Sequence, residues 1–230
     1  MAENRSILPS VTTVHKADWR QALKDLEDLQ VKQFAVFLTG LSSSERSDLY
    51  HILEDMKGIR IPFVHAVSEM TPEEYRYLMD TFGTKKFNLH TLRSWPLKYP
   101  LGELTKYIYI ENSGVIPTQA DLEGFAGLLI DMSHLENTRL SKPKDYQDLM
   151  NLIRTNPVGA NHISAILKQP VTDRWGFHYD MHRLTDLTQL NYLKDIPDYC
   201  FGGYQVIELS NSIKEQLEVI EYIQKNNLTP

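Results

Sequence analysis

The stretch GLLIDMSHLE at residues 127–136 shows a pattern that recurs along the chain. Three apolar residues run directly into Asp131, and after His134 the sequence becomes polar. An unpaired buried carboxylate is costly, so a short buried strand ends on a charged residue only where something pairs with that charge. Because Asp131 and His134 stand three residues apart at the C-terminal end of such a strand, both can point at one metal cluster.

Short apolar strands ending in His, Asp or Glu alternate with helical patterns along the whole chain. Strands are expected at 7–13, 33–40, 61–67, 87–90, 107–111, within 127–136, at 160–166 and at 204–209. Helical spacing covers 17–29, 42–58, 71–83, 118–125, 145–153, 184–193 and 212–223, with a weak pattern at 97–104, whereas 177–182 is expected to be extended or looped. Strands that alternate with helices imply a parallel sheet, and about eight such units favour a closed barrel. We therefore predict an α/β protein, a (β/α)8 TIM barrel that forms a single domain over residues 1–230.

The composition is that of an ordinary globular protein, with 42% apolar and 23% charged residues. No run approaches the ~20 apolar residues of a membrane span, and the first ten residues lack a signal-peptide pattern. The single cysteine, Cys200, excludes an internal disulfide and fits a reducing compartment, so we expect a cytoplasmic protein. The net charge of -6 argues against non-specific nucleic-acid binding, although bound metal ions would offset it locally.

Side chains that can bind metal gather at or just past the predicted strand ends. They are His65, His90, Glu111, Asp131, His134, His162, Asp180, His182 and Glu208. Four carboxylates at one barrel mouth would repel one another strongly without cations. Imidazole and carboxylate ligands without a thiolate suit zinc, manganese or iron. The set is too large for one tetrahedral ion, so it predicts a cluster of two or three metals.

The motifs that carry these residues resemble those of a known group of proteins. They are IEN at 110–112, IDMSH at 130–134, NHI at 161–163, YDMH at 179–182 and IEL at 207–209. Their layout is similar to that of the xylose isomerase-like TIM-barrel superfamily, which includes endonuclease IV and many sugar isomerases and epimerases. In endonuclease IV two strand-end histidines precede a Glu, D-x-x-H, a His, D-x-H and a Glu. All nine positions have a counterpart here, in the same order, from about the third strand onward.

The resemblance implies a role for each ligand. The shared core of the superfamily would be Glu111, Asp131, His162 and Glu208. A second metal, bridged by Glu111, would be held by His65 and His90. A third would be held by His134, Asp180 and His182. The isomerases and epimerases as a rule lack the flanking histidines and the D-x-H, so the site is more similar to the multinuclear, hydrolytic branch, with Zn²⁺ as the expected metal.

Two functions follow from this resemblance. The first is a metal-dependent phosphoester hydrolase, acting on a small phosphorylated substrate or on damaged DNA at an abasic site, with Glu208 orienting the nucleophile. The alternative is a sugar or sugar-phosphate isomerase or epimerase with one Mn²⁺ or Mg²⁺, in which Glu111 and Glu208 exchange a proton as acid and base. A third possibility is a barrel that binds metal but has no catalytic activity.

Three cationic side chains follow predicted strand ends, where a phosphate or a sugar carboxylate could be bound. They are Arg93, Lys168 and Arg174. Arginine and lysine pair well with such anions, although plain surface charge is the slightly favoured explanation. His178 is expected to shape the pocket rather than to bind metal.

Overall fold

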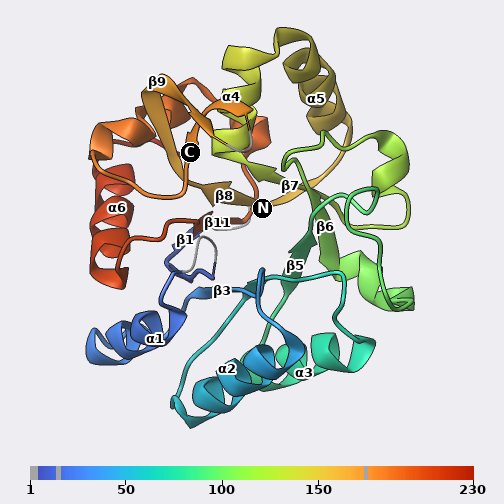
Figure 1. Ribbon diagram of the computed structural model, residues 1–230, viewed down its shortest axis with the longest axis vertical. Coiled ribbons are helices and arrows are strands. Elements are labelled where there is room, and N and C mark those ends of the chain that lie inside the picture. The colour runs from blue at the N-terminus through green and yellow to red at the C-terminus, as the bar shows by residue number, and fades with distance from the viewer. Residues whose placement is uncertain (1–4, 14–16, 174–175) are drawn as a thin grey trace.

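The computed structural model describes residues 5–13, 17–173 and 176–230. The strands of its main sheet are β1 (Ser6–Leu8), β2 (Ser10–Val11), β3 (Ala35–Phe37), β4 (Phe63–His65), β5 (Lys86–Leu89), β6 (Ile108–Glu111), β7 (Gly127–Asp131), β8 (Val158–Ile163) and β11 (Tyr204–Ile207). In the described residues these nine strands follow the order β1-β11-β8-β7-β6-β5-β4-β3-β2, and each neighbouring pair is parallel. Helices surround the strands on the outside (Figure 1). The predicted α/β class and TIM-barrel fold are therefore confirmed as a nearly closed parallel barrel.

The barrel closes through a first strand that is divided in two. One strand was expected over residues 7–13, but Pro9 has no N–H to donate to a neighbouring strand and separates β1 from β2. β1 pairs with β11, whereas β2 pairs with β3. The carbonyl of Pro9 still accepts a hydrogen bond from the Ala35 N–H at 2.9 Å. The two halves therefore join the last strand of the barrel to the second.

Among the described residues, five of the six α-helices begin at a side-chain cap, and α5 begins at a proline. The α-helices are α1 (Trp19–Asp28), α2 (Ser43–Asp55), α3 (Pro72–Phe82), α4 (Met132–Ser141), α5 (Pro143–Thr155) and α6 (Ile213–Lys225). Shorter 3-10 helices are η2 (Gly102–Tyr107), η3 (Gln119–Leu122), η4 (Leu187–Asp195) and η5 (Asp198–Cys200). Ser42 and Ser212 form capping boxes at α2 and α6, and Gly83 ends α3 in the left-handed conformation. None of the helices in the described ranges is long and apolar enough to cross a membrane.

The interior of the barrel is filled by a small apolar cluster. Its buried members are Leu8, Ala35, Phe37, Phe63, Leu129, Ala160 and Val206. Side chains two residues apart on a strand point to the same face. Four of these strands therefore carry a polar side chain directly above the cluster, at the C-terminal end of the barrel: His65, Asp131, His162 and Glu208. The fold thus places the candidate ligands on an apolar floor at the end where barrel enzymes carry their active sites.

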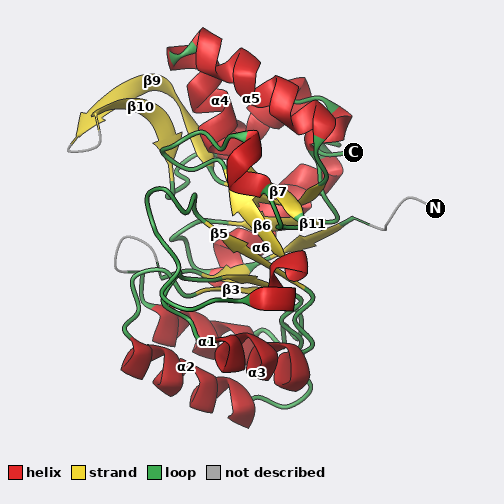
Figure 2. Ribbon diagram, turned by 90° about the vertical axis from the view of Figure 1, so that its right-hand side faces the viewer, coloured by secondary structure: helices red, strands yellow, loops and turns green. Residues whose placement is uncertain are grey.

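Two elements near the site differ from the sequence-based expectation. Strand β9 (Ala165–Asp173) forms an antiparallel hairpin with β10 (Gly176–Met181), which projects from the body of the molecule (Figure 2). The expected strand at 160–166 reached only the first two residues of β9, because most of β9 is exposed and its apolar run is short; the extended segment at 177–182 was anticipated. Helix α4 was also missed: it begins at Met132, directly after β7, and His134 lies on its first turn.

Candidate metal centre

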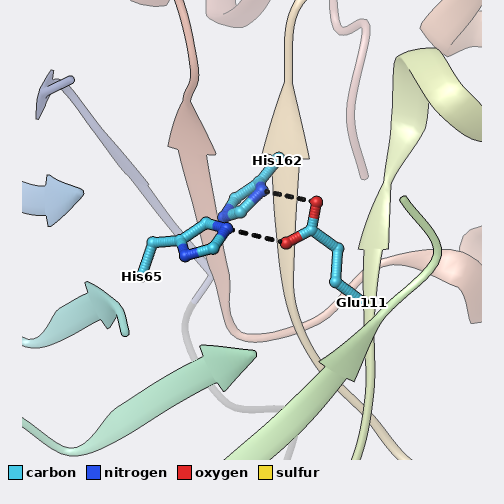
Figure 3. Close-up of side chains that lie close together, drawn as sticks. All are labelled: His65, Glu111 and His162. Atoms are coloured by element: carbon cyan, nitrogen blue, oxygen red, sulfur yellow. Dashed lines mark ion pairs between the residues drawn. The ribbon is translucent and has the colours of Figure 1, made fainter. Parts of the chain in front are cut away.

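Glu111, the last residue of β6, lies at the centre of the candidate site and is buried. The Nε2 atom of His65 lies 3.0 Å from Glu111 Oε2, and His162 Nδ1 lies 3.7 Å from Glu111 Oε1 (Figure 3). His90 Nε2 is 3.8 Å from Glu111 Oε2. Asn88 donates a hydrogen bond of 2.5 Å to the same oxygen. One carboxylate therefore meets three imidazoles that come from three different strand ends.

Two overlapping sets of ligand atoms contain Glu111. We call His65, Glu111 and His162 the first group, and Glu111, Asp131, His162 and Glu208 the second group; within each group the ligand atoms lie within 4.8 Å of one another. All of these residues are buried. In the second group His162 Nδ1 approaches Glu208 Oε2 to 3.1 Å. The second group matches the four-residue core that the resemblance implied.

A third group lies beside the second, at the base of the hairpin. It consists of His134 on α4, Asp180 on β10 and His182 just after β10, and its ligand atoms also lie within 4.8 Å of one another. His134 Nδ1 is 3.4 Å from Asp180 Oδ2, and His134 Nε2 is 3.7 Å from Asp131 Oδ2. His182 Nδ1 is 3.9 Å from Glu208 Oε1. The third group is therefore continuous with the second.

The structure thus brings eight of the nine predicted ligands into these three groups. The ninth, His90, contacts Glu111 beside the first group. The sequence-based pairing of His65 with His90 differs in detail, because His162 rather than His90 completes the first group. His178, which was expected to shape the pocket, lies next to the third group, with its Nδ1 3.0 Å from the Asp180 carbonyl.

The two carboxylate oxygens of Asp131 have different surroundings: Oδ1 caps helix α4, and Oδ2 faces the candidate site. As the N-cap of α4 it accepts hydrogen bonds at Oδ1 from the His134 N–H, at 2.9 Å, and from the Ser133 hydroxyl, at 2.8 Å. Asn112 fixes the Asp131 backbone by accepting from its N–H at 2.6 Å and donating to its carbonyl at 3.1 Å. Oδ2 accepts no hydrogen bond from the described residues and is buried. Helix capping therefore orients this carboxylate and leaves one oxygen for the site.

The charges of the second group are strongly coupled. Burial alone would lower the pKa of His162, but the carboxylates of Glu208 and Glu111 outweigh it and raise that pKa to about 10. Burial would raise the pKa of Glu208, but His162 and His182 lower it to about 2. The pKa of Glu111 is likewise held well below its usual value by the surrounding histidines, against the effect of burial. At neutral pH without metal, His162 is therefore a cation between two carboxylates.

The pKa values of the histidines near the third and first groups are shifted in opposite directions. Burial opposes protonation of His134, yet Asp131 and Asp180 raise its pKa to about 9. Burial raises the pKa of Asp131 and is only partly opposed by His134. His90 behaves in the opposite way, because burial outweighs the attraction of Glu111 and lowers its pKa to about 4. His90 is therefore neutral at pH 7, as a metal ligand must be.

Several buried polar atoms of the second group lack hydrogen bonds within the described ranges. They are Asp131 Oδ2, both ring nitrogens of His162 and Glu208 Oε2. Buried polar atoms are almost always satisfied, and leaving one unsatisfied costs about 1–3 kcal/mol. Metal coordination would satisfy the two carboxylate oxygens and one ring nitrogen of His162, because a neutral imidazole has one free lone pair. Imidazole nitrogens and carboxylate oxygens without a thiolate form a ligand set for zinc, manganese or iron, so these residues fit a divalent metal cluster.

Two of the three cationic residues expected to bind substrate, Arg93 and Lys168, lie in the part of the chain that the structure describes. Arg93 binds Asp121, with its Nε 3.0 Å from Oδ1, and donates to the Ile116 carbonyl at 2.8 Å, so it ties two loops together. Substrate binding by Arg93 stays a prediction. Lys168 is exposed on β9. Arg174 lies outside the described residues.

Two asparagines of the site were not identified from the sequence. Asn88 contacts Glu111, and Asn112 holds the Asp131 backbone. The strand alternation contained a signal for Asn88, because it stands two residues before His90 and therefore on the same face. Asn112 follows Glu111 directly, and its role depends on the neighbouring strand, which local sequence does not reveal.

No protein-family model and no curated protein matches this chain. The fold and the site define the class of protein. It is a TIM-barrel-like protein with buried histidine, glutamate and aspartate groups that could bind metal at the C-terminal ends of its strands.

Proposed function

We propose that the protein is a metal-dependent phosphoester hydrolase of the xylose isomerase-like superfamily, with a site for two or three Zn²⁺ ions. The observation that carries the proposal is the contiguity of three groups of ligand atoms, each within 4.8 Å. A single ion would need only the second group. The third group, with Asp180 and His182, supplies ligands for a further ion, as in the hydrolytic branch of the superfamily.

The residues have distinct tasks in this proposal. His65, Glu111 and His162 would hold one ion, and the carboxylates of Glu111, Asp131 and Glu208 would hold another. Bound divalent ions would supply Lewis acidity and a nucleophile at neutral pH. Glu208 is ionised in the metal-free protein, where its pKa is about 2. Bound cations would keep it ionised, so it can accept a hydrogen bond from an attacking water and orient it. Asn88 fixes Glu111 Oε2 through its 2.5 Å hydrogen bond and thereby orients the bridging carboxylate.

The proposed substrate is a small phosphorylated molecule. Binding of duplex DNA depends largely on cationic contacts with phosphates, whereas this chain has a net charge of -6. The Arg93 guanidinium is also bound to Asp121. Damaged DNA therefore ranks second as a substrate and enters the test below.

The alternative function is that of a sugar or sugar-phosphate isomerase or epimerase. One observation favours it: the second group by itself holds four ligands for a single Mn²⁺ or Mg²⁺. Glu111 and Glu208 approach His162 Nδ1 to 3.7 and 3.1 Å, so both carboxylates face the same space. They could then exchange a proton with a substrate carbon as acid and base.

Metal content and activity separate these two functions. Protein purified without added metal should carry two or three Zn²⁺ per chain and should hydrolyse bis(p-nitrophenyl) phosphate or a sugar phosphate. His182→Ala should lose one ion and reduce kcat by at least about 100-fold, a typical effect of disturbing a catalytic metal. The matched control is His51→Ala, which changes an exposed histidine of α2 and should leave both values unchanged.

The same preparations should be tested on abasic-site DNA and on a panel of ketoses. One ion per chain together with epimerisation of a ketose would overturn the hydrolase and establish the isomerase. If the protein nicks abasic DNA and His182→Ala abolishes this activity, the hydrolase proposal stands, but the substrate is DNA and not a small molecule.

A further inference from the structure

A cavity of about 360 Å³ opens beside the first group, at the C-terminal end of the barrel. Its walls come from the segments that follow β3 and β4 and from the end of β5. His90 lines it, and the same side chain lies 3.8 Å from Glu111 Oε2. The cavity therefore adjoins the candidate metal centre through one shared histidine.

Trp95 forms one wall of this cavity and is unusually exposed for its size, with 59% of its surface accessible. Its backbone N–H donates to the Thr91 carbonyl at 3.1 Å, and Lys98 N–H donates to the Ser68 carbonyl at 2.9 Å. These bonds tie the segment that carries the indole to the segment after β4. The Trp95 ring lies 6.5 Å from the His90 ring, centroid to centroid. An aromatic face is thus held open to solvent within reach of the metal centre.

The other walls indicate which chemical group fits. Four aliphatic residues line the cavity: Leu41, Ala66, Val67 and Leu89. Thr39, Ser42 and Ser68 also line it and offer hydroxyl groups to the polar edge of a bound ring. Among the described residues that line the cavity, His90 is the sole side chain able to become cationic, and Glu69 adds a negative charge, so a phosphate does not fit. A flat, largely apolar ring does.

We propose that this cavity binds a planar heteroaromatic group, of the nucleobase class, stacked on Trp95. The inference rests on the proposed function and extends it: the substrate would be a phosphoester of a nucleoside, with its base in the cavity and its phosphate at the metal centre. Base–aromatic stacking tolerates different bases because each has a flat face. Trp95 is then a specificity residue that contacts the substrate away from the reacting atoms.

Binding of uncharged probes to the metal-free protein, residues 1–230, tests this assignment independently of hydrolysis. Adenosine and ribose are titrated separately and followed by saturation-transfer NMR and isothermal titration calorimetry. Adenosine should bind and ribose should not. Trp95→Ala should raise the Kd for adenosine at least about tenfold, or about 1.4 kcal/mol, whereas Trp95→Phe should retain most of the affinity.

Tyr99→Ala is the matched control, because Tyr99 is a nearby exposed aromatic residue, 43% accessible, that does not line the cavity. Its Kd for adenosine should equal that of the unaltered protein. An unchanged Kd in Trp95→Ala, equal binding of ribose, or no binding of adenosine to the unaltered protein would each overturn the proposal. The probes carry no phosphate, so their binding does not depend on hydrolysis. If the protein binds adenosine through Trp95 but hydrolyses no phosphoester, the proposed hydrolase function is refuted and the proposed nucleobase site stands.

Discussion

Binding of Zn²⁺ to the metal-free protein should release about two protons at pH 7, because two ligand histidines are protonated before the metal arrives. The pKa values of His162 and His134 are about 10 and about 9, so both carry a proton at pH 7. A metal binds only the neutral imidazole, and each ring must therefore lose that proton. Glu208, with a pKa of about 2, and His90, with a pKa of about 4, add nothing to the count.

The sign of the pH effect follows from the same values. Because protons compete with the metal below the folded-state pKa values, the apparent affinity should rise with pH, by roughly a hundredfold per pH unit for two protons. The rise should weaken above pH about 9, where His134 loses its proton, and end near pH about 10, where His162 does.

Isothermal titration calorimetry in buffers of different ionisation enthalpy measures the released protons directly. The slope of the observed enthalpy against the buffer ionisation enthalpy should be about two for the unaltered protein. It should fall by about one in His162→Gln and stay unchanged in His51→Gln, which alters an exposed histidine. A slope near zero, or a slope that His162→Gln leaves intact, would show that these imidazoles are not charged ligands and would refute the electrostatic reasoning.

Three further changes probe the interior of the barrel. Gly159→Ala would place a Cβ inside the Tyr109 ring and should lower the free energy of unfolding by about 1–3 kcal/mol in urea titrations; no loss would mean that the ring moves freely. In metal-free protein the raised pKa of His162, about 10, contributes stability that is complete below its ordinary pKa of 6.5 and is lost as the pH rises toward 10. The Tm should therefore fall over that interval, and His162→Gln should flatten the fall. Asp131→Asn keeps the capping oxygen but removes the carboxylate that contributes most to the raised pKa of His134, so it should lower that pKa and weaken metal binding; an unchanged titration of His134 by NMR would contradict this.

The barrel and most of its ligands were predictable because they depend on short-range periodicity. An apolar residue that points inward and a polar residue two positions later share one face of a strand. Leu129 with Asp131 and Ala160 with His162 both follow this rule. In a closed parallel sheet the C-terminal strand ends meet at one rim, so residues far apart in the chain could be assigned to one site without any knowledge of their contacts.

The parts that the sequence did not predict depend on contacts between segments. Strand β9 is held by its pairing with β10 and has few buried residues of its own, so no local pattern identifies it. The guanidinium of Arg93 is taken up by Asp121, which is 28 residues away. The cavity at Trp95 exists because three separate segments meet there. Each feature is non-local, and a single sequence contains no periodic signal for it.

At Asp131 the local sequence pattern and the contacts in the structure lead to the same site for different reasons. Its spacing of three residues from His134 was read as two ligands on one strand end, and in the structure both residues lie beside the site. The structural reason is different, however: Asp131 caps α4, and the cap sets the direction of its second oxygen. The capped helix carries His134 on its first turn, so one local interaction positions ligands of two neighbouring groups. We infer that deleting a residue at the boundary between β7 and α4 would disturb the second and third groups together.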